Sequence, residues 1–303
     1  MSYDVKSIRE EFKKRGVFYT PPELAEMIKS YTPEHVTEVY DPTCGDGGLL
    51  RVFSDDVKKY GQEIDESQCI VAEKTLVNKE IICGDTLTNP AFRDKKFECI
   101  VANPPFSIKW DPKIDERFEE APTIPTAGKA DYAFILHILH YLSNTGIAVV
   151  LDAPGILYRG NREYKIRKWI VENNYIEKIV MIPGDTFVDT TISTVLIVFN
   201  KHKTNTNIEF EDKKIGKKRV VEISEIVAND YNLSLNIYVY EDVIKETIDP
   251  IKVNDTARHE MISKIEKDIR FDLMVCDLEK LDKDEYIDMI IDKLEHIKKE
   301  NHE

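Results

Sequence analysis

The sequence predicts an α/β protein built on a doubly wound, mostly parallel sheet, followed by a helical C-terminal tail. Two observations predict the sheet: short runs rich in valine and isoleucine recur along the first two thirds of the chain, and helical patterns stand between several of them. Strands that are apolar throughout indicate a sheet covered on both faces. The tail is predicted by charged sequence with apolar residues at helical spacing after about residue 255.

The expected elements follow one another along the chain. The first predicted helix covers residues 20–30, where two consecutive prolines suit a first turn. The predicted strands then lie at residues 36–42, 60–64, 80–85, 97–105, 146–153, 178–183 and 193–200. Two more helices are predicted at residues 130–142 and 162–174. The last two strands are compatible with an antiparallel edge of the sheet, and residues 205–219 with a loop or hairpin.

Composition limits the class of protein. A chain of 303 residues with 42% hydrophobic residues has room for one large domain and an appendage. It contains no apolar run long enough to cross a membrane, and its charged N-terminus has no signal-peptide core. The five cysteines are scattered without a CxxC pair, which argues against a zinc site and a disulfide framework. We therefore expect a cytoplasmic protein without metal.

A glycine-rich turn and two acids predict a nucleoside-binding site. The turn, Asp41 to Gly48, follows a predicted strand and precedes a helix, so its backbone can approach a ligand closely. Glu63 ends the next predicted strand, where a carboxylate can accept both hydroxyls of a ribose. Asp85 ends the third and can accept from an adenine amino group. The glycine-rich segment alone is as compatible with a plain turn, and either acid alone is better explained as a surface-loop acid; in series they favour a cofactor pocket.

The segment Asn103-Pro104-Pro105-Phe106 is the most specific pattern in the chain. An exocyclic amino nitrogen is a poor nucleophile because its lone pair is delocalised into the ring. The side-chain oxygen of Asn103 and the carbonyl of Pro104 can accept both amino hydrogens and so favour a localised lone pair. The prolines restrict the backbone and fix the direction of that carbonyl, and Phe106 offers a face for a flipped base. The alternative is a proline-stiffened strand end without chemistry.

With these motifs the chain resembles the N6-adenine DNA methyltransferases, most closely the methylation subunits of type I restriction-modification systems. The resemblance runs from about Gly16 to about Val239. An entry motif at residues 16–22 precedes the glycine-rich turn and the Asn-Pro-Pro-Phe segment follows it, which is similar to the motif order of the gamma class. The second half of the family pattern is matched at residues 130–134, 155–160, 163–168 and 191–194.

The resemblance implies a Rossmann-like, S-adenosylmethionine-dependent methyltransferase fold. It implies an adenine-specific DNA methyltransferase that transfers a methyl group from S-adenosyl-L-methionine to N6 of a flipped adenine in double-stranded DNA, within a restriction-modification system. The implied cofactor residues are Phe18, Tyr19, Thr20, Asp41, Thr43, Gly45, Glu63, Ile64, Asp85, Thr86 and Asn103. The implied target-adenine residues are Asn103, Pro104, Pro105 and Phe106.

Domain organisation departs from the family pattern. We expect an N-terminal helical extension at residues 1–15, a methyltransferase domain at 16–245 and a helical tail at 246–303. Only the short extension precedes the entry motif, and the residues after the catalytic segment are too few for a target-recognition domain. We therefore expect a specificity subunit or another DNA-reading partner to select the sequence, or else a reduced form of the enzyme. The tail either packs on its own domain or binds that partner.

The net charge of −14 supports the expectation of a partner, because a protein that holds DNA alone usually carries a basic face. The local basic clusters, at residues 13–15, 159–168 and 213–219, are each as compatible with a solvated surface as with phosphate contacts. Two other functions stay open: methylation of RNA or of a protein glutamine, and a non-catalytic DNA-binding regulatory subunit. Methyl transfer to DNA, RNA or protein would separate the first, and cofactor binding the second.

Overall fold

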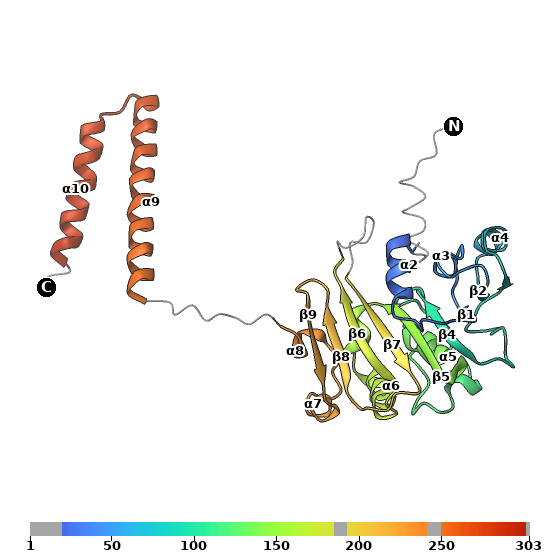
Figure 1. The fold of residues 1–303 in the computed structure, drawn as a ribbon. Helices are drawn as coiled ribbons and strands as arrows, with labels where there is room; N and C mark the ends of the chain where they lie inside the picture. The colour runs from blue at the N-terminus through green and yellow to red at the C-terminus, as the bar shows by residue number, and fades with distance from the viewer. Residues whose placement is uncertain (1–19, 185–192, 241–249, 301–303) are drawn as a thin grey trace, which may run out of the picture. The chain divides into compact units, whose positions relative to one another are not determined.

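The computed structural model describes residues 20–184, 193–240 and 250–300 (Figure 1). The chain divides into two compact units between residues 241 and 242. The extension expected at residues 1–15 lies outside the described residues, as do Phe18 and Tyr19. Within the described ranges, no helix combines the length and the apolar character that a membrane span requires.

One nine-stranded sheet forms the centre of the first unit. Its strands are β1 (Glu38–Asp41), β2 (Lys58–Glu63), β3 (Lys79–Cys83), β4 (Phe97–Ala102), β5 (Leu142–Asp152), β6 (Ile176–Ile182), β7 (Thr194–Asn200), β8 (Ile208–Asp212) and β9 (Lys217–Val221). Across the sheet they lie in the order β3-β2-β1-β4-β5-β7-β6-β8-β9. Neighbours from β3 to β5 are parallel, whereas β7 is antiparallel to both β5 and β6. The predicted α/β fold with a mostly parallel sheet is confirmed.

Helices connect these strands and cover both faces of the sheet. They are α2 (Pro22–Lys29), α3 (Gly48–Arg51), α4 (Glu66–Thr75), α5 (Asp131–Tyr141), α6 (Asn161–Glu172), α7 (Ile223–Ala228) and α8 (Leu235–Tyr238), with short 3-10 helices η1 (Glu116–Phe118) and η2 (Pro154–Leu157). Successive side chains of a strand point to opposite faces. In β4, Cys99 and Val101 accordingly join the apolar core under α2, α3 and α4, and Ile100 and Ala102 join the core under α5 and α6. The three helices predicted within this unit are confirmed.

The far end of the sheet differs from the prediction. We expected residues 178–183 and 193–200 to form an antiparallel edge, and they do pair antiparallel as β6 and β7. They are not the edge, because β8 pairs in parallel with β6 and β9 follows it as a hairpin partner. Residues 205–219 therefore contribute most of a hairpin that extends the sheet. The edge strand β9 begins with Lys217, Lys218 and Arg219, which are all exposed. Its sequence therefore lacks the alternation of apolar and polar residues that predicts a strand.

Two helices make up the described part of the second unit, α9 (Pro250–Glu279) and α10 (Lys283–Glu300), which confirms the helical tail. The turn between them includes Lys280 in the left-handed conformation, with φ of 56°. A hydrogen bond from the Tyr286 hydroxyl to Asp272 and an ion pair between Lys283 and Asp277 join the helices, each at 2.5 Å. These contacts make α9 and α10 a helical hairpin.

Candidate active site

The carboxyl ends of four parallel strands bring the predicted site residues to one edge of the sheet. Asp41 ends β1, Glu63 ends β2, Asp85 lies two residues beyond β3, and Asn103 directly follows β4. These strands are neighbours in the order β3-β2-β1-β4. Ligands of doubly wound sheets bind in the crevice at this edge. The predicted cofactor acids and the predicted catalytic asparagine thus share one crevice edge.

The glycine-rich turn owes its shape to two residues in the left-handed conformation. Gly45 has φ of 54° and Gly47 has φ of 88°, which side chains with a Cβ rarely adopt. A Cβ at Gly45 would meet no atom within 4 Å, so conformation rather than packing requires this glycine. The space above the turn is therefore left open for a ligand.

Asp41 fixes the start of this turn from below. Its buried carboxylate accepts from the backbone N–H of Thr43 at 2.9 Å and from the Thr43 hydroxyl at 3.4 Å. Burial raises the pKa of Asp41 to about 8, and the nearby charge of Glu63 adds to the shift while the Thr43 N–H opposes it. Asp41 consequently anchors the turn through the Thr43 backbone and hydroxyl.

Glu63 joins the turn to the end of β2. Its two carboxylate oxygens accept from the backbone N–H groups of Gly45 and Asp65, each at 2.9 Å. A carboxylate oxygen has two acceptor sites, so each can still accept a ligand hydroxyl. The next side chain, Ile64, is 69% exposed beside it, which leaves an apolar surface next to a fixed acceptor pair.

The loop after β3 is tied to the loop after β1. Asp85 accepts from the Leu87 N–H at 2.8 Å and from the Thr88 hydroxyl at 2.9 Å. The buried hydroxyl of Thr86 donates to the carbonyl of Pro42. The Thr86 side chain therefore holds two ligand-facing loops together.

Asn103 has one side-chain group bonded and the other without a partner. Its Nδ2 donates to Thr20 Oγ1 at 2.9 Å, whereas its Oδ1 is buried and accepts no hydrogen bond from any residue that the structure describes. A buried acceptor without a partner is costly and rare in native proteins. The adjacent Pro104 is buried, and Pro105 and Phe106 are half-buried. Asn103 Oδ1 is thus an acceptor prepared for a donor that a ligand supplies.

A network of buried charged side chains supports the segment Asn103 to Phe106 through the next residue, Ser107. Ser107, which follows Phe106, has φ of 54° and donates its N–H to Asp131 Oδ1 at 2.9 Å. Arg159 donates to Ser107 Oγ at 3.0 Å and pairs with Asp131 at 3.3 Å. Asp152, at the end of β5, is fully buried near Asp131; burial and the charge of Asp131 raise its pKa well above the usual range. The network holds the residue after Phe106 in a conformation that it would not favour alone.

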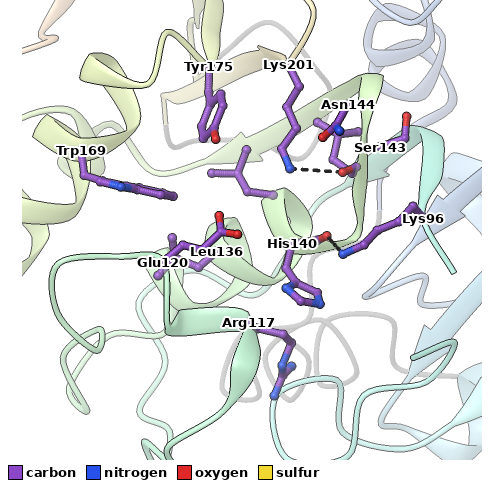
Figure 2. Close-up of a pocket in the computed structure, with 12 residues that line it drawn as sticks. Lys96, Arg117, Glu120, Leu136, His140, Ser143, Asn144, Trp169, Tyr175 and Lys201 are labelled. Carbon is purple, nitrogen blue, oxygen red and sulfur yellow. Dashed lines mark hydrogen bonds between the residues drawn. The ribbon is translucent and has the colours of Figure 1, made fainter. Parts of the chain in front are cut away.

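A pocket of about 340 Å³ lies near the start of β5 (Figure 2), and none of the predicted site residues is in its lining. Lys96 and Lys201 point into it, but Lys96 donates to the carbonyl of His140 and Lys201 to that of Leu142, at 3.2 Å. Both carbonyls belong to the C-terminal end of α5, where cations complement the helix dipole. We therefore assign these lysines to the capping of α5.

A profile of the N-6 DNA methylase family matches residues 5–219, which is more than two thirds of the chain. The chain belongs to the N-6 DNA methylase family. It is 31% identical over 321 residues to the type I restriction enzyme MpnII methylase subunit of Mycoplasma pneumoniae, an alignment that covers 85% of this chain and 59% of that relative. The chain thus spans less than two thirds of that relative's length.

Solved structures agree with this family and this fold. The type I restriction-modification system methyltransferase subunit from Streptococcus thermophilus superposes with a TM-score of 0.67 at 28% identity, over 74% of this chain and 59% of that one. A putative class I S-adenosylmethionine-dependent methyltransferase from Listeria monocytogenes superposes with a TM-score of 0.52 at 15% identity, over 71% of each chain. This N-6 DNA methylase therefore has the class I methyltransferase fold.

Sequence reasoning missed one residue that shapes the site of this N-6 DNA methylase. Arg117, which is buried, donates to the carbonyls of Thr86 and Leu87 at 2.8 and 2.7 Å. Its Nε and Nη2 donate to Asp115 and hold the pKa of that carboxyl at about 2. Arg117 thereby fixes the loop that carries Asp85. No motif marks an arginine 31 positions beyond the residue it holds.

The cysteines also depart from the sequence prediction, which expected no disulfide. The structure joins Cys69 of α4 to Cys83 of β3, with Cα atoms 6.0 Å apart. Packing of α4 against β3 brings the two residues together, and a spacing of 14 positions does not reveal that contact. Cys44, Cys99 and Cys276 are buried thiols.

Proposed function

We propose that the chain is the catalytic part of an adenine-specific DNA methyltransferase that uses S-adenosyl-L-methionine and modifies N6 of a flipped adenine. The buried Asn103 Oδ1, which lacks a hydrogen-bond partner beside Pro104, carries this proposal. The family match and the named type I methylase relatives favour DNA adenine over RNA or a protein glutamine. The complete tetrad Asn103-Pro104-Pro105-Phe106 argues against a subunit without catalytic activity.

The cofactor residues of the proposed enzyme surround the strand ends. Glu63 would accept the ribose hydroxyls, Asp85 the adenine amino group, and Ile64 would pack against the adenine. The open backbone of Gly45 would leave room for the cofactor's amino acid part. Asp41, Thr43 and Thr86 would act by holding the two loops in place. The expected roles of Phe18, Tyr19 and Thr20 complete the set.

The reaction needs the amino nitrogen of adenine to present its lone pair. Asn103 Oδ1 and the Pro104 carbonyl would each accept one amino hydrogen, and a closed, low-dielectric site would strengthen both bonds. When bound, the cofactor supplies an electrophilic methyl group on a positively charged sulfur. Thr20 would keep the Asn103 amide turned so that Oδ1 rather than Nδ2 faces the base, because the hydroxyl bonds Nδ2. Phe106 would stack on the flipped ring.

We also propose that residues 16–245 are the methyltransferase domain and that the helical region at 246–303 binds a DNA-reading partner, namely a specificity subunit of a restriction-modification system. The support is the exposed apolar side chains of the helical hairpin. They include Met261, Ile262, Ile265, Phe271, Met274, Leu278, Leu281, Ile287, Met289, Ile291, Leu294 and Ile297. Apolar patches of this kind mark interaction surfaces. The net charge of −14 favours a partner that shares the grip on DNA.

Labelled methyl transfer tests the catalytic proposal. We expect the chain, with its specificity subunit, to transfer labelled methyl groups to duplex DNA and not to RNA or protein. Asn103→Ala should abolish the transfer while calorimetry still detects cofactor binding, because the lost acceptor contacts the target and not the cofactor. Turnover by Asn103→Ala at the wild-type rate would refute the mechanism.

A further inference from the structure

A pocket of about 440 Å³ opens at the N-terminus of α6. Three cationic side chains line it: Lys129, Arg159 and Arg162. Arg159 is engaged with Asp131 and Glu163, at 3.3 and 3.5 Å. Among the described residues, neither Lys129 nor Arg162 has an ion-pair partner. Two cations at the pocket are therefore left to attract an anion.

The backbone and one buried carboxyl add to this pocket. Gly160, the N-cap of α6, provides no side-chain acceptor for the N–H groups of the first turn, and such groups favour anions. Glu163 lines the same pocket; its side chain is 6% exposed, and its Oε2 lies 3.5 Å from Arg159 Nη1. Burial raises the pKa of Glu163, while the nearby charge of Arg159 lowers it, so Arg159 offsets the negative charge of Glu163 in the pocket wall.

The pocket is connected to the catalytic segment through direct contacts. Arg159, in its wall, donates to the side chain of Ser107, the residue after Phe106. The chain that continues from Ser107 pairs with the loop that carries Lys129: Ala130 N–H donates to the Ile108 carbonyl at 2.8 Å, and Trp110 N–H to the Ala127 carbonyl at 3.1 Å. The pocket and the tetrad are therefore built on one shared loop pair.

We propose that this pocket binds a backbone phosphodiester of the DNA strand that carries the target adenine. The proposal rests on the proposed DNA methyltransferase activity. A base that has left the stack must be held through its backbone, and phosphate contacts fix the position of a nucleic acid on a protein. Lys129, Arg162 and the first turn of α6 supply donors for one phosphate beside the tetrad. In a chain of net charge −14, such a local cationic site matters more than the overall charge.

The first test measures how salt changes the binding of the full chain to a labelled duplex of mixed sequence, by fluorescence anisotropy. The double variant Lys129→Gln/Arg162→Gln should bind more weakly, and the slope of log affinity against log salt should fall by about 1. The control Lys165→Gln/Lys168→Gln removes the same amount of charge from α6, outside the pocket lining, and should keep the wild-type slope. Equal slopes for the two double variants, or a wild-type chain without salt-dependent binding, would overturn the proposal.

A second variant separates lost binding from lost folding. Gly160→Asp suits the observed backbone, with φ of −86°, and its Cβ would meet no atom within 4 Å. Aspartate is a favoured N-cap residue, so it should preserve or raise the melting temperature while it occupies the donors of the first turn. We expect weaker DNA binding from a protein that is at least as stable. Wild-type affinity in this variant would contradict a phosphate at the helix N-terminus.

Inorganic phosphate distinguishes a DNA contact from a site for free anions. If Lys129→Gln/Arg162→Gln abolishes phosphate binding in calorimetry but leaves the DNA salt slope unchanged, the pocket serves a free anion and the proposal fails. The proposed enzymatic function is judged separately, by cofactor binding and methyl transfer. A chain that transfers no methyl group but loses salt dependence in the double variant would keep the phosphate site and lose the proposed activity.

Discussion

Thr20 Oγ1 accepts a hydrogen bond from Asn103 Nδ2 at 2.9 Å, across 83 positions of the chain. The bond determines which end of the Asn103 amide is presented to a ligand, because it engages the nitrogen and leaves Oδ1 buried without a partner. It also joins the entry motif at residues 16–22 to the tetrad, two segments that are far apart in the sequence.

Thr20→Val is therefore expected to lower the turnover of methyl transfer more than it lowers cofactor affinity. Loss of the hydroxyl leaves Asn103 Nδ2 without its acceptor at a cost of about 1–3 kcal/mol, which corresponds to about 5- to 150-fold in rate. Thr20→Ser keeps the hydroxyl and should retain most of the turnover. Single-turnover kinetics with labelled cofactor measures the effect. Equal rates for the valine and serine variants would show that the bond does not orient Asn103.

Glu63→Ala is expected to weaken cofactor binding by about 1–3 kcal/mol, because a half-buried acceptor for the ribose hydroxyls is removed. The substitution also leaves the Gly45 and Asp65 N–H groups without their present acceptor. Titration calorimetry with S-adenosylmethionine measures the loss. Glu66→Ala, at an exposed position of α4, is the matched control. If Glu63→Ala bound S-adenosylmethionine with unchanged affinity, Glu63 would not be the acceptor for the ribose hydroxyls.

Asp41 should make stability depend on pH in a defined window. The pKa of Asp41 is raised from 3.8 to about 8, so between these values the native state keeps a proton that the unfolded state has lost. Stability should therefore fall as pH rises through this window, by at most about 1.4 kcal/mol per pH unit for one group. Asp41→Asn keeps an acceptor for Thr43 and should flatten the dependence. Parallel pH profiles of the melting temperature for both proteins would contradict the buried, protonated carboxyl.

The helical hairpin should bind its partner through exposed apolar side chains. Leu278 and Leu294 are 76% and 59% exposed, so Leu278→Glu/Leu294→Glu should preserve helicity and abolish association with a specificity subunit. Sedimentation of the mixed proteins measures the association. A chain that ends near residue 250 should likewise lose the partner and keep cofactor binding, since every proposed cofactor residue lies in the first unit. Efficient methylation of one defined DNA sequence by the isolated chain would argue against this need for a partner.

The sequence allowed the strands and helices of the first unit to be predicted because apolar patterns determine them. Strand β4 and helix α5 are buried along most of their length, and most of their residues are accordingly apolar. The acids at the strand ends were predictable because parallel strands end at one edge. The roles of the individual site residues in binding cofactor and adenine stay predictions.

What the sequence did not reveal depends on contacts between distant residues. Arg117 supports the loop of Asp85 by donating to backbone carbonyls. Every residue has such a carbonyl, so the sequence does not show which ones Arg117 contacts. Asp152 is buried near Asp131 only because β5 ends where α5 begins to pack against it. The pairing of Cys69 with Cys83 likewise depends on helix packing.

The charged edge strand β9 has a consequence for the solubility of the protein. An open strand edge offers unpaired N–H and C=O groups to the edge of another molecule, which is a route to aggregation. Lys217, Lys218 and Arg219 place long charged side chains along that edge, and charged side chains of this kind disfavour edge-to-edge pairing of sheets. The same three residues that made this segment look unlike a strand therefore disfavour self-association through β9.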